Sequence, residues 1–205
     1  IVKCLHKMKH KNGIVFLDEL DKISNEPDIS AALLHLLDQS QNYDFKDNYL
    51  SELSIDLSHL WYVSSMNKIP TDSALADRLW IVEVKGYNHS DKVQIVEHYL
   101  LPKALKNVGL DPGSVRFTSA SVAFFVHKVC KEHDRGVRSL QKAITDLINK
   151  VHFISLHQDS SGALPFKVSF DMGSMLRFPV SVDETMINML MDDRALNMSV
   201  AMMYT

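Results

Sequence analysis

The sequence predicts a mixed fold in which an α/β unit is followed by an all-α unit. Three apolar runs rich in β-branched and aromatic residues occur early in the chain, at residues 14–17, 60–66 and 79–84, and a segment of helical periodicity separates the first two. Strands that alternate with helices are typical of an α/β layer sheet. After Gly86 the apolar residues recur at helical spacing instead. We therefore predict an α/β unit up to residue 86 and a helical unit from residue 87.

The composition excludes several classes of protein. The 205 residues are 46% hydrophobic and 23% charged, which excludes disorder over the whole length and a small disulfide-stapled fold. With 22 basic and 25 acidic residues there is no global positive field, so nucleic acid is not an expected partner. Cys4 and Cys130 lack metal-ligand spacing, and no apolar run approaches about 18 residues. We expect an intracellular protein without a membrane span, cytoplasmic or in an organellar matrix.

Local patterns predict each element of the first unit in turn. Residues 14–17 form an apolar run that ends in two carboxylates, as a buried parallel strand does. Residues 27–37 begin with proline and carry apolar residues at helical spacing, which predicts a helix packed on the sheet. Residues 53–57 alternate between apolar and polar, which indicates a half-exposed extended piece. The runs at 60–66 and 79–84 are predicted strands.

The second unit is predicted to be mainly helical. Ser90 is expected to cap a helix that continues through residue 105 and is kinked by Pro102. Eight of the ten methionines lie in the last 34 residues, where core packing is favoured over a partner-binding surface. The remaining elements are a turn at residues 111–113, helices over 118–129, 137–151 and 183–191, and a short strand at 165–170.

Two adjacent carboxylates, Asp18 and Glu19, follow the first predicted strand. At the mouth of a parallel sheet such a pair can handle a metal-bound polyphosphate. The first carboxylate can hold Mg²⁺ through water, and the second can orient or deprotonate an attacking water. The alternative is a strand that runs into a solvated turn.

Three further polar residues follow strands or begin a helix. Asn67 ends the second predicted strand, where its amide could hold the same water, although asparagine is also a common turn residue. Arg78 precedes the third run and could reach a phosphate of a neighbouring subunit; the alternative is an ion pair with Asp77. Arg138 opens the long helix of the second unit as a further cation, or as an ordinary solvated arginine.

At these residues the chain resembles the AAA+ ATPases and, within them, the Lon ATP-dependent proteases. The segment Gly13-Ile14-Val15-Phe16-Leu17-Asp18-Glu19-Leu20-Asp21-Lys22-Ile23 resembles the family's Walker B segment. Further pieces similar to Lon follow in the family's order through about residue 158, at residues 31–38, 41–42, 45–50, 56–58, Asn67, 69–70, 75–78, 86–87, 99–103 and 136–140. The resemblance implies a partial AAA+ α/β nucleotide-binding domain followed by a small α-helical lid.

The resemblance also implies a role for each candidate residue. Asp18 would be the metal-associated Walker B carboxylate and Glu19 the water-activating one, with Asn67 as sensor 1. Arg78 would be the arginine finger that acts on the adjacent protomer, and Arg138 would be sensor 2. The implied cofactors are ATP and Mg²⁺. Lon-type proteins form hexameric rings that thread unfolded protein substrates into a chamber with a Ser-Lys proteolytic dyad.

The chain also departs from the family. The Gly-rich phosphate loop, the aromatic pore loop and the protease domain have no counterpart here, so we expect a fragment that does not bind ATP tightly and is inactive alone. His35 and Ser40 replace an acidic residue and a proline, which indicates a diverged member. The expected plan is a partial large subdomain over residues 1–86, a lid over 87–178, and a Met-rich segment of unknown role over 179–205.

Two other functions remain open at this point. One is a non-protease AAA+ unfoldase of the ClpX type, which has a similar sequence around the position of Asp18. Residues 45–50 and 99–103 favour Lon instead. The other is a non-catalytic AAA+ subunit that serves assembly or regulation.

Overall fold

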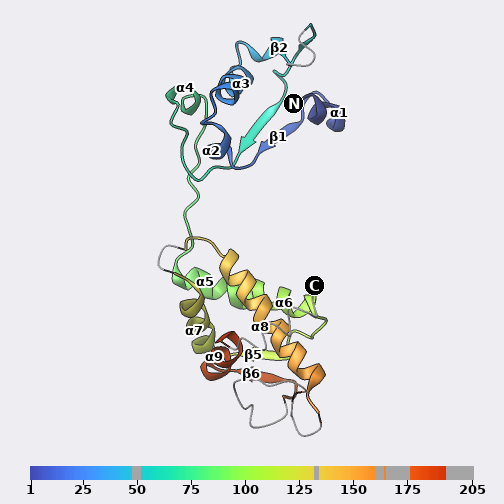
Figure 1. The fold of residues 1–205 in the computed structure, drawn as a ribbon, viewed down its shortest axis with the longest axis vertical. Helices are drawn as coiled ribbons and strands as arrows, with labels where there is room; N and C mark the ends of the chain where they lie inside the picture. Colours follow the sequence, from blue (N-terminus) through green and yellow to red (C-terminus); the bar gives the residue numbers. More distant parts are fainter. Residues whose placement is uncertain (48–51, 132–133, 160–163, 165–175, 193–205) are drawn as a thin grey trace. The chain divides into compact units, whose positions relative to one another are not determined.

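The computed structural model describes residues 1–47, 52–131, 134–159, 164 and 176–192. The chain divides into two compact units, Ile1–Glu83 and Val84–Thr205, each with its own hydrophobic core (Figure 1). Both units mix helices with small sheets. In the part of the chain that is described, no helix is long and apolar enough to cross a bilayer.

The first unit is built on a parallel pair of strands. β1 (Ile14–Leu17) and β4 (Trp61–Ser64) pair with Leu17 opposite Ser64, so the carboxyl ends of both strands lie at one edge. The predicted strand at 14–17 and helix at 27–37 are confirmed. The other elements are an antiparallel pair, β2 (Phe45–Lys46) and β3 (Ser54–Ile55), and the helices α1 (Val2–Met8), α2 (Leu20–Ile23), α3 (Pro27–Leu37), η1 (Asn42–Asp44, a 3-10 turn) and α4 (Ser73–Ala76).

Helix α3 anchors the core of this unit. Proline stands at its first position, where the ring sets φ and the missing N–H has no helical partner to lose. Leu33 and Leu36 then face inward, where they join the fully buried Leu20, Leu57 and Leu75. The extended piece at residues 53–57 is partly confirmed, since β3 is short and Leu57 is completely buried.

Two predictions for the sheet are wrong. β1 is not a buried strand, because Ile14 and Phe16 are 68% and 60% exposed and Val15 alone is buried. Residues 79–84 form no strand, and Trp80 is 92% exposed. A strand needs a paired neighbour and a layer that covers its apolar face. The described residues supply β1 with one neighbour and one covered face, and supply residues 79–84 with neither.

The second unit begins with one long, interrupted helix. Asn88 caps α5 (His89–Ile95) by a reciprocal pair of hydrogen bonds with Asp91, so the cap predicted at Ser90 lies two residues too late. A π-helical turn, η2 (Val96–Leu100), leads into α6 (Leu101–Asn107). This interruption is the predicted effect of Pro102, which has no N–H to donate to the preceding turn.

The rest of the second unit packs around α8. The helices α7 (Ser119–Val129, capped by Thr118), α8 (Arg138–His157) and α9 (Glu184–Asp192) confirm the predicted helices. The unit is mainly helical, as predicted, but it is not purely α-helical, because β5 (Val115–Phe117) pairs in parallel with β6 (Val180–Val182). Three-residue strands carry almost no periodic signal, and these two pair across more than 60 residues of sequence.

Residues 180–192 belong to the core of the second unit, in line with the core packing expected for the methionines of this segment. Val182, Ile187 and Leu190 are buried, and Met186 and Met191 pack against the same core. The buried Lys150 joins α8 to α9, since its Nζ lies 2.8 Å from the Leu190 carbonyl and 2.6 Å from the Asp146 carboxylate. The strand predicted at 165–170 and the methionines at 172, 175, 198, 202 and 203 lie outside the described residues.

Candidate functional site

The turn between β1 and α2 carries the two predicted carboxylates. Asp18 follows the last strand residue, and Glu19 takes the N-cap position of α2 with φ 54° and ψ 46°. This is the left-handed region, which residues other than glycine seldom occupy. Both side chains are exposed.

Ser65, just beyond the end of β4, is bonded to every part of this turn. The Glu19 N–H donates to Ser65 Oγ at 3.0 Å, and the Ser65 hydroxyl donates to Asp18 Oδ1. In the main chain, the Ser65 N–H donates to the Leu17 carbonyl at 3.0 Å, and the Leu20 N–H donates to the Ser65 carbonyl at 2.9 Å. The sequence analysis missed Ser65; its place at the end of a strand that is parallel to β1 is the signal that could have identified it.

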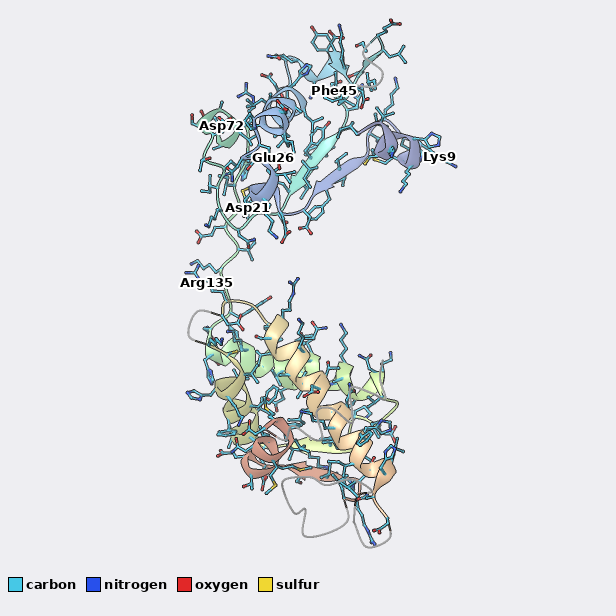
Figure 2. All side chains as sticks on the ribbon, in the orientation of Figure 1. Lys9, Asp21, Glu26, Phe45, Asp72 and Arg135 are labelled. Carbon is cyan, nitrogen blue, oxygen red and sulfur yellow. The ribbon has the colours of Figure 1, made fainter. Side chains whose placement is uncertain are left out.

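Asn67 is brought to the same edge of the sheet. Its N–H donates to Asp21 Oδ1 at 3.2 Å, which joins the segment after β4 to the first turn of α2. Asp21 is labelled there in Figure 2. The parallel pairing of β1 and β4 therefore places Asp18, Glu19 and Asn67 at one edge, as the strand order predicts.

The Glu19 carboxylate forms an ion pair with Lys22, with 2.7 Å between Oε2 and Nζ. This hydrogen bond is the main cause that raises the pKa of Lys22, followed by the charge of Glu19 itself. The Lys22 side chain is 63% exposed and that of Glu19 52%. Exposed pairs of this kind are weak and are exchanged with water, so Glu19 is available to a bound water or ligand.

Arg78 is anchored within its own unit. Its Nη2 donates to Asp38 Oδ2 at 2.9 Å and its Nη1 to the Ala74 carbonyl at 2.8 Å. The Ser40 hydroxyl and then Arg78 are the main causes that lower the pKa of Asp38 to about 2, so this carboxylate is charged at neutral pH. The ion-pair alternative named Asp77, but the observed partner is Asp38, 40 residues away in sequence. No hydrogen bond joins Arg78 to Asp18 or Glu19 among the described residues.

Arg138 belongs to the second unit, where it is the first residue of α8. The loop before it is well bonded: the Asp134 carboxylate accepts from the Ser139 hydroxyl and, at 3.2 Å, from the Gly136 N–H. The Ser139 bond is the main cause that lowers the pKa of Asp134. The Lys92 ammonium donates to the Asp134 carbonyl. The start of α8 is therefore held in place, while the Arg138 side chain is exposed.

Gly86 brings the start of the second unit against this loop. The Tyr87 N–H donates to the Arg135 carbonyl at 3.1 Å. A Cβ on Gly86 would lie 2.6 Å from the Arg135 Cβ and 3.0 Å from the Arg135 carbonyl oxygen. Figure 2 labels Arg135 at this point. Only glycine allows the two backbones to come this close.

We expect Gly86→Ala to lower the free energy of unfolding of the second unit by about 1 to 3 kcal/mol, because the added methyl group must displace Arg135. Urea unfolding followed by circular dichroism measures the change. Gly113→Ala is the matched control, since a Cβ there has nothing within 4 Å, and it should alter stability by less than about 0.5 kcal/mol. Equal stability of the two variants would show that Arg135 moves aside without cost.

No three or more His, Cys, Asp or Glu side chains in the described ranges form a group that could hold a metal ion. Mg²⁺ in nucleotide sites is held by one or two carboxylates, with waters and phosphate oxygens completing its shell. The exposed Asp18 carboxylate, with Oδ1 bonded to Ser65 and Oδ2 without a hydrogen bond among the described residues, fits that role. An open hollow beside α3, lined by residues such as His35 and Phe45, contains none of the predicted site residues.

Several known proteins are similar to this chain. No family model matches the chain. It is 38% identical over 156 residues to the mitochondrial Lon protease homolog of Drosophila melanogaster, covering 75% of this chain and 15% of that protein. It is 37% identical over 153 residues to the Lon protease of Acinetobacter baumannii, covering 74% and 18%. The human mitochondrial Lon protease homolog is 37% identical over 153 residues, covering 73% and 16%. The chain thus spans less than a fifth of each of these relatives.

Proposed function

Because the chain belongs to the Lon protease family, we propose that it is part of the ATP-hydrolysing module of an ATP-dependent protease. The observation that carries this proposal is the edge formed by β1 and β4, where Asp18 and Glu19 share one turn and Asn67 lies beside it. Carboxylates at the carboxyl ends of parallel strands stand where α/β proteins bind nucleotides.

Each of the candidate site residues is assigned a role in the hydrolysis of ATP. Asp18 would hold Mg²⁺, which when bound neutralises charge on the phosphate oxygens. Glu19 accepts a proton from the attacking water at its carboxylate, and the Asn67 amide orients that water. Arg78 would act on the nucleotide of an adjacent protomer, and Arg138 would be the sensor 2 arginine.

The full-length protein is then a homo-oligomer, a hexameric ring, that unfolds and translocates protein substrates for degradation in the cytoplasm or an organellar matrix. The relatives named above are all Lon proteases, which does not favour a ClpX-type unfoldase or a non-catalytic AAA+ subunit.

The test is the activity of the full-length protein that contains this segment. We expect it to degrade an unfolded reporter protein only with ATP and Mg²⁺, and we expect EDTA to abolish both ATP hydrolysis and degradation until Mg²⁺ is restored in excess. Coupled ATPase and fluorescent peptide-release assays measure the two activities. Degradation that proceeds without ATP would contradict the proposal, and hydrolysis without any protease activity would support an unfoldase instead.

A further inference from the structure

Ser65 is bonded both to the main chain and to a side chain of the turn that carries Asp18 and Glu19. Two of its four hydrogen bonds use its main chain, to Leu17 and Leu20, and would survive replacement of Ser65 by alanine or threonine. The other two use its hydroxyl, which accepts from the Glu19 N–H and donates to Asp18 Oδ1. The hydroxyl therefore touches both residues that carry the proposed chemistry.

The left-handed backbone of Glu19 depends on these bonds. Such a conformation is unfavourable for a residue with a Cβ and persists where the surrounding structure holds it. Here Leu17 and Leu20, which flank Asp18 and Glu19, are bonded to the Ser65 main chain, and the Glu19 N–H donates to the Ser65 hydroxyl. Loss of the hydroxyl would leave this N–H without its partner and the turn free to relax.

The second bond orients Asp18. A hydroxyl can accept one hydrogen bond and donate another at the same time, which alanine cannot do and threonine can. By donating to Oδ1, Ser65 restrains the rotation of the Asp18 carboxylate. Oδ2, which makes no hydrogen bond among the described residues, remains available to a ligand.

We propose that Ser65 is a positioning residue for the reaction, which sets the Asp18 carboxylate and the Glu19 backbone through its hydroxyl. The catalytic role of Ser65 depends on the proposed function. The structural part of the inference, that Ser65 holds the turn, can be measured without nucleotide.

The structural part is tested by amide hydrogen exchange, followed by NMR, on the 205-residue chain. In Ser65→Ala the Glu19 amide should exchange at least about tenfold faster, whereas the Leu20 amide, bonded to the Ser65 carbonyl, should keep its protection. Ser65→Thr should retain slow exchange at Glu19. Ser58→Ala is the matched control. The Ser58 hydroxyl makes a similar hydrogen bond to the Asp56 carboxylate, at 2.6 Å, and neither residue belongs to the site.

An unchanged Glu19 amide in a folded Ser65→Ala chain overturns the proposal. If Ser65→Ala loses protection at Leu20 as well, the unit has unfolded, and Ser65→Thr decides: fast exchange at Glu19 in the folded threonine variant overturns the proposal, and slow exchange supports it.

The catalytic part is tested in the full-length protein. Ser65→Ala should lower kcat for ATP hydrolysis by about 10-fold to 100-fold with little change in KM for ATP, and Ser65→Thr should restore most of it. A normal kcat for Ser65→Ala in a protein whose unmodified form hydrolyses ATP overturns the positioning role. If the unmodified protein hydrolyses no ATP, the proposed function fails, while the exchange experiment still decides whether Ser65 holds the turn.

Discussion

Replacing Glu19 by glutamine in the full-length protein is expected to cut ATP hydrolysis by at least about 100-fold while nucleotide binding persists. Glutamine has the same shape and keeps the Glu19 N–H that donates to Ser65, so the turn is retained. It has no carboxylate to accept the proton of the attacking water, and removal of a general base costs about 10² to 10⁴ in rate. Steady-state hydrolysis and binding of a fluorescent nucleotide measure the two effects separately.

The matched control for this variant is Glu26→Gln. Glu26 is an exposed glutamate in the same unit, labelled in Figure 2, and its side chain caps no helix. The Glu26→Gln protein should hydrolyse ATP at the rate of the unmodified protein. If Glu19→Gln did so too, Glu19 would be no more than the residue that starts α2.

Replacing Arg78 by alanine is expected to lower hydrolysis by about 10³-fold to 10⁵-fold, the value of an arginine supplied in trans to the transferred phosphoryl group. In the described unit two of its N–H groups are used, by Asp38 and the Ala74 carbonyl. A guanidinium has five such donors, and the side chain is 33% exposed. The anchored arginine therefore keeps donors that can meet a neighbour's nucleotide.

Two comparisons separate this role from that of a simple ion pair. Asp38→Asn removes the charge that Arg78 pairs with but keeps the guanidinium, and should cost less than about tenfold in rate. Subunits with Arg78→Ala mixed with subunits with Glu19→Gln should recover part of the activity, since some interfaces then join an intact arginine to an intact base. Equal losses in Arg78→Ala and Asp38→Asn, with no recovery on mixing, would make Arg78 a structural residue only.

The candidate site was predicted in part. Asp18, Glu19 and Asn67 could be placed at one edge because apolar strands that end in polar residues are a local signal and parallel strands share their carboxyl edge. The place of Ser65 at the end of a strand parallel to β1 was a signal, but a weak one, because serine is common at strand ends. Its bonds to Asp18 and Glu19 join residues 47 and 46 positions apart. The roles of Arg78 and Arg138 stay predictions.

The sequence by itself determined the elements whose signals are local: β1 from its apolar run, α3 from its proline and helical spacing, and α7 and α8 from theirs. Tertiary structure alone decided what depends on a distant partner. It paired β5 with β6, anchored Arg78 on Asp38, and left residues 79–84 without a strand partner among the described residues. Periodicity reports which face of an element is apolar, but hydrogen bonds between strands and between side chains depend on groups that only folding brings together.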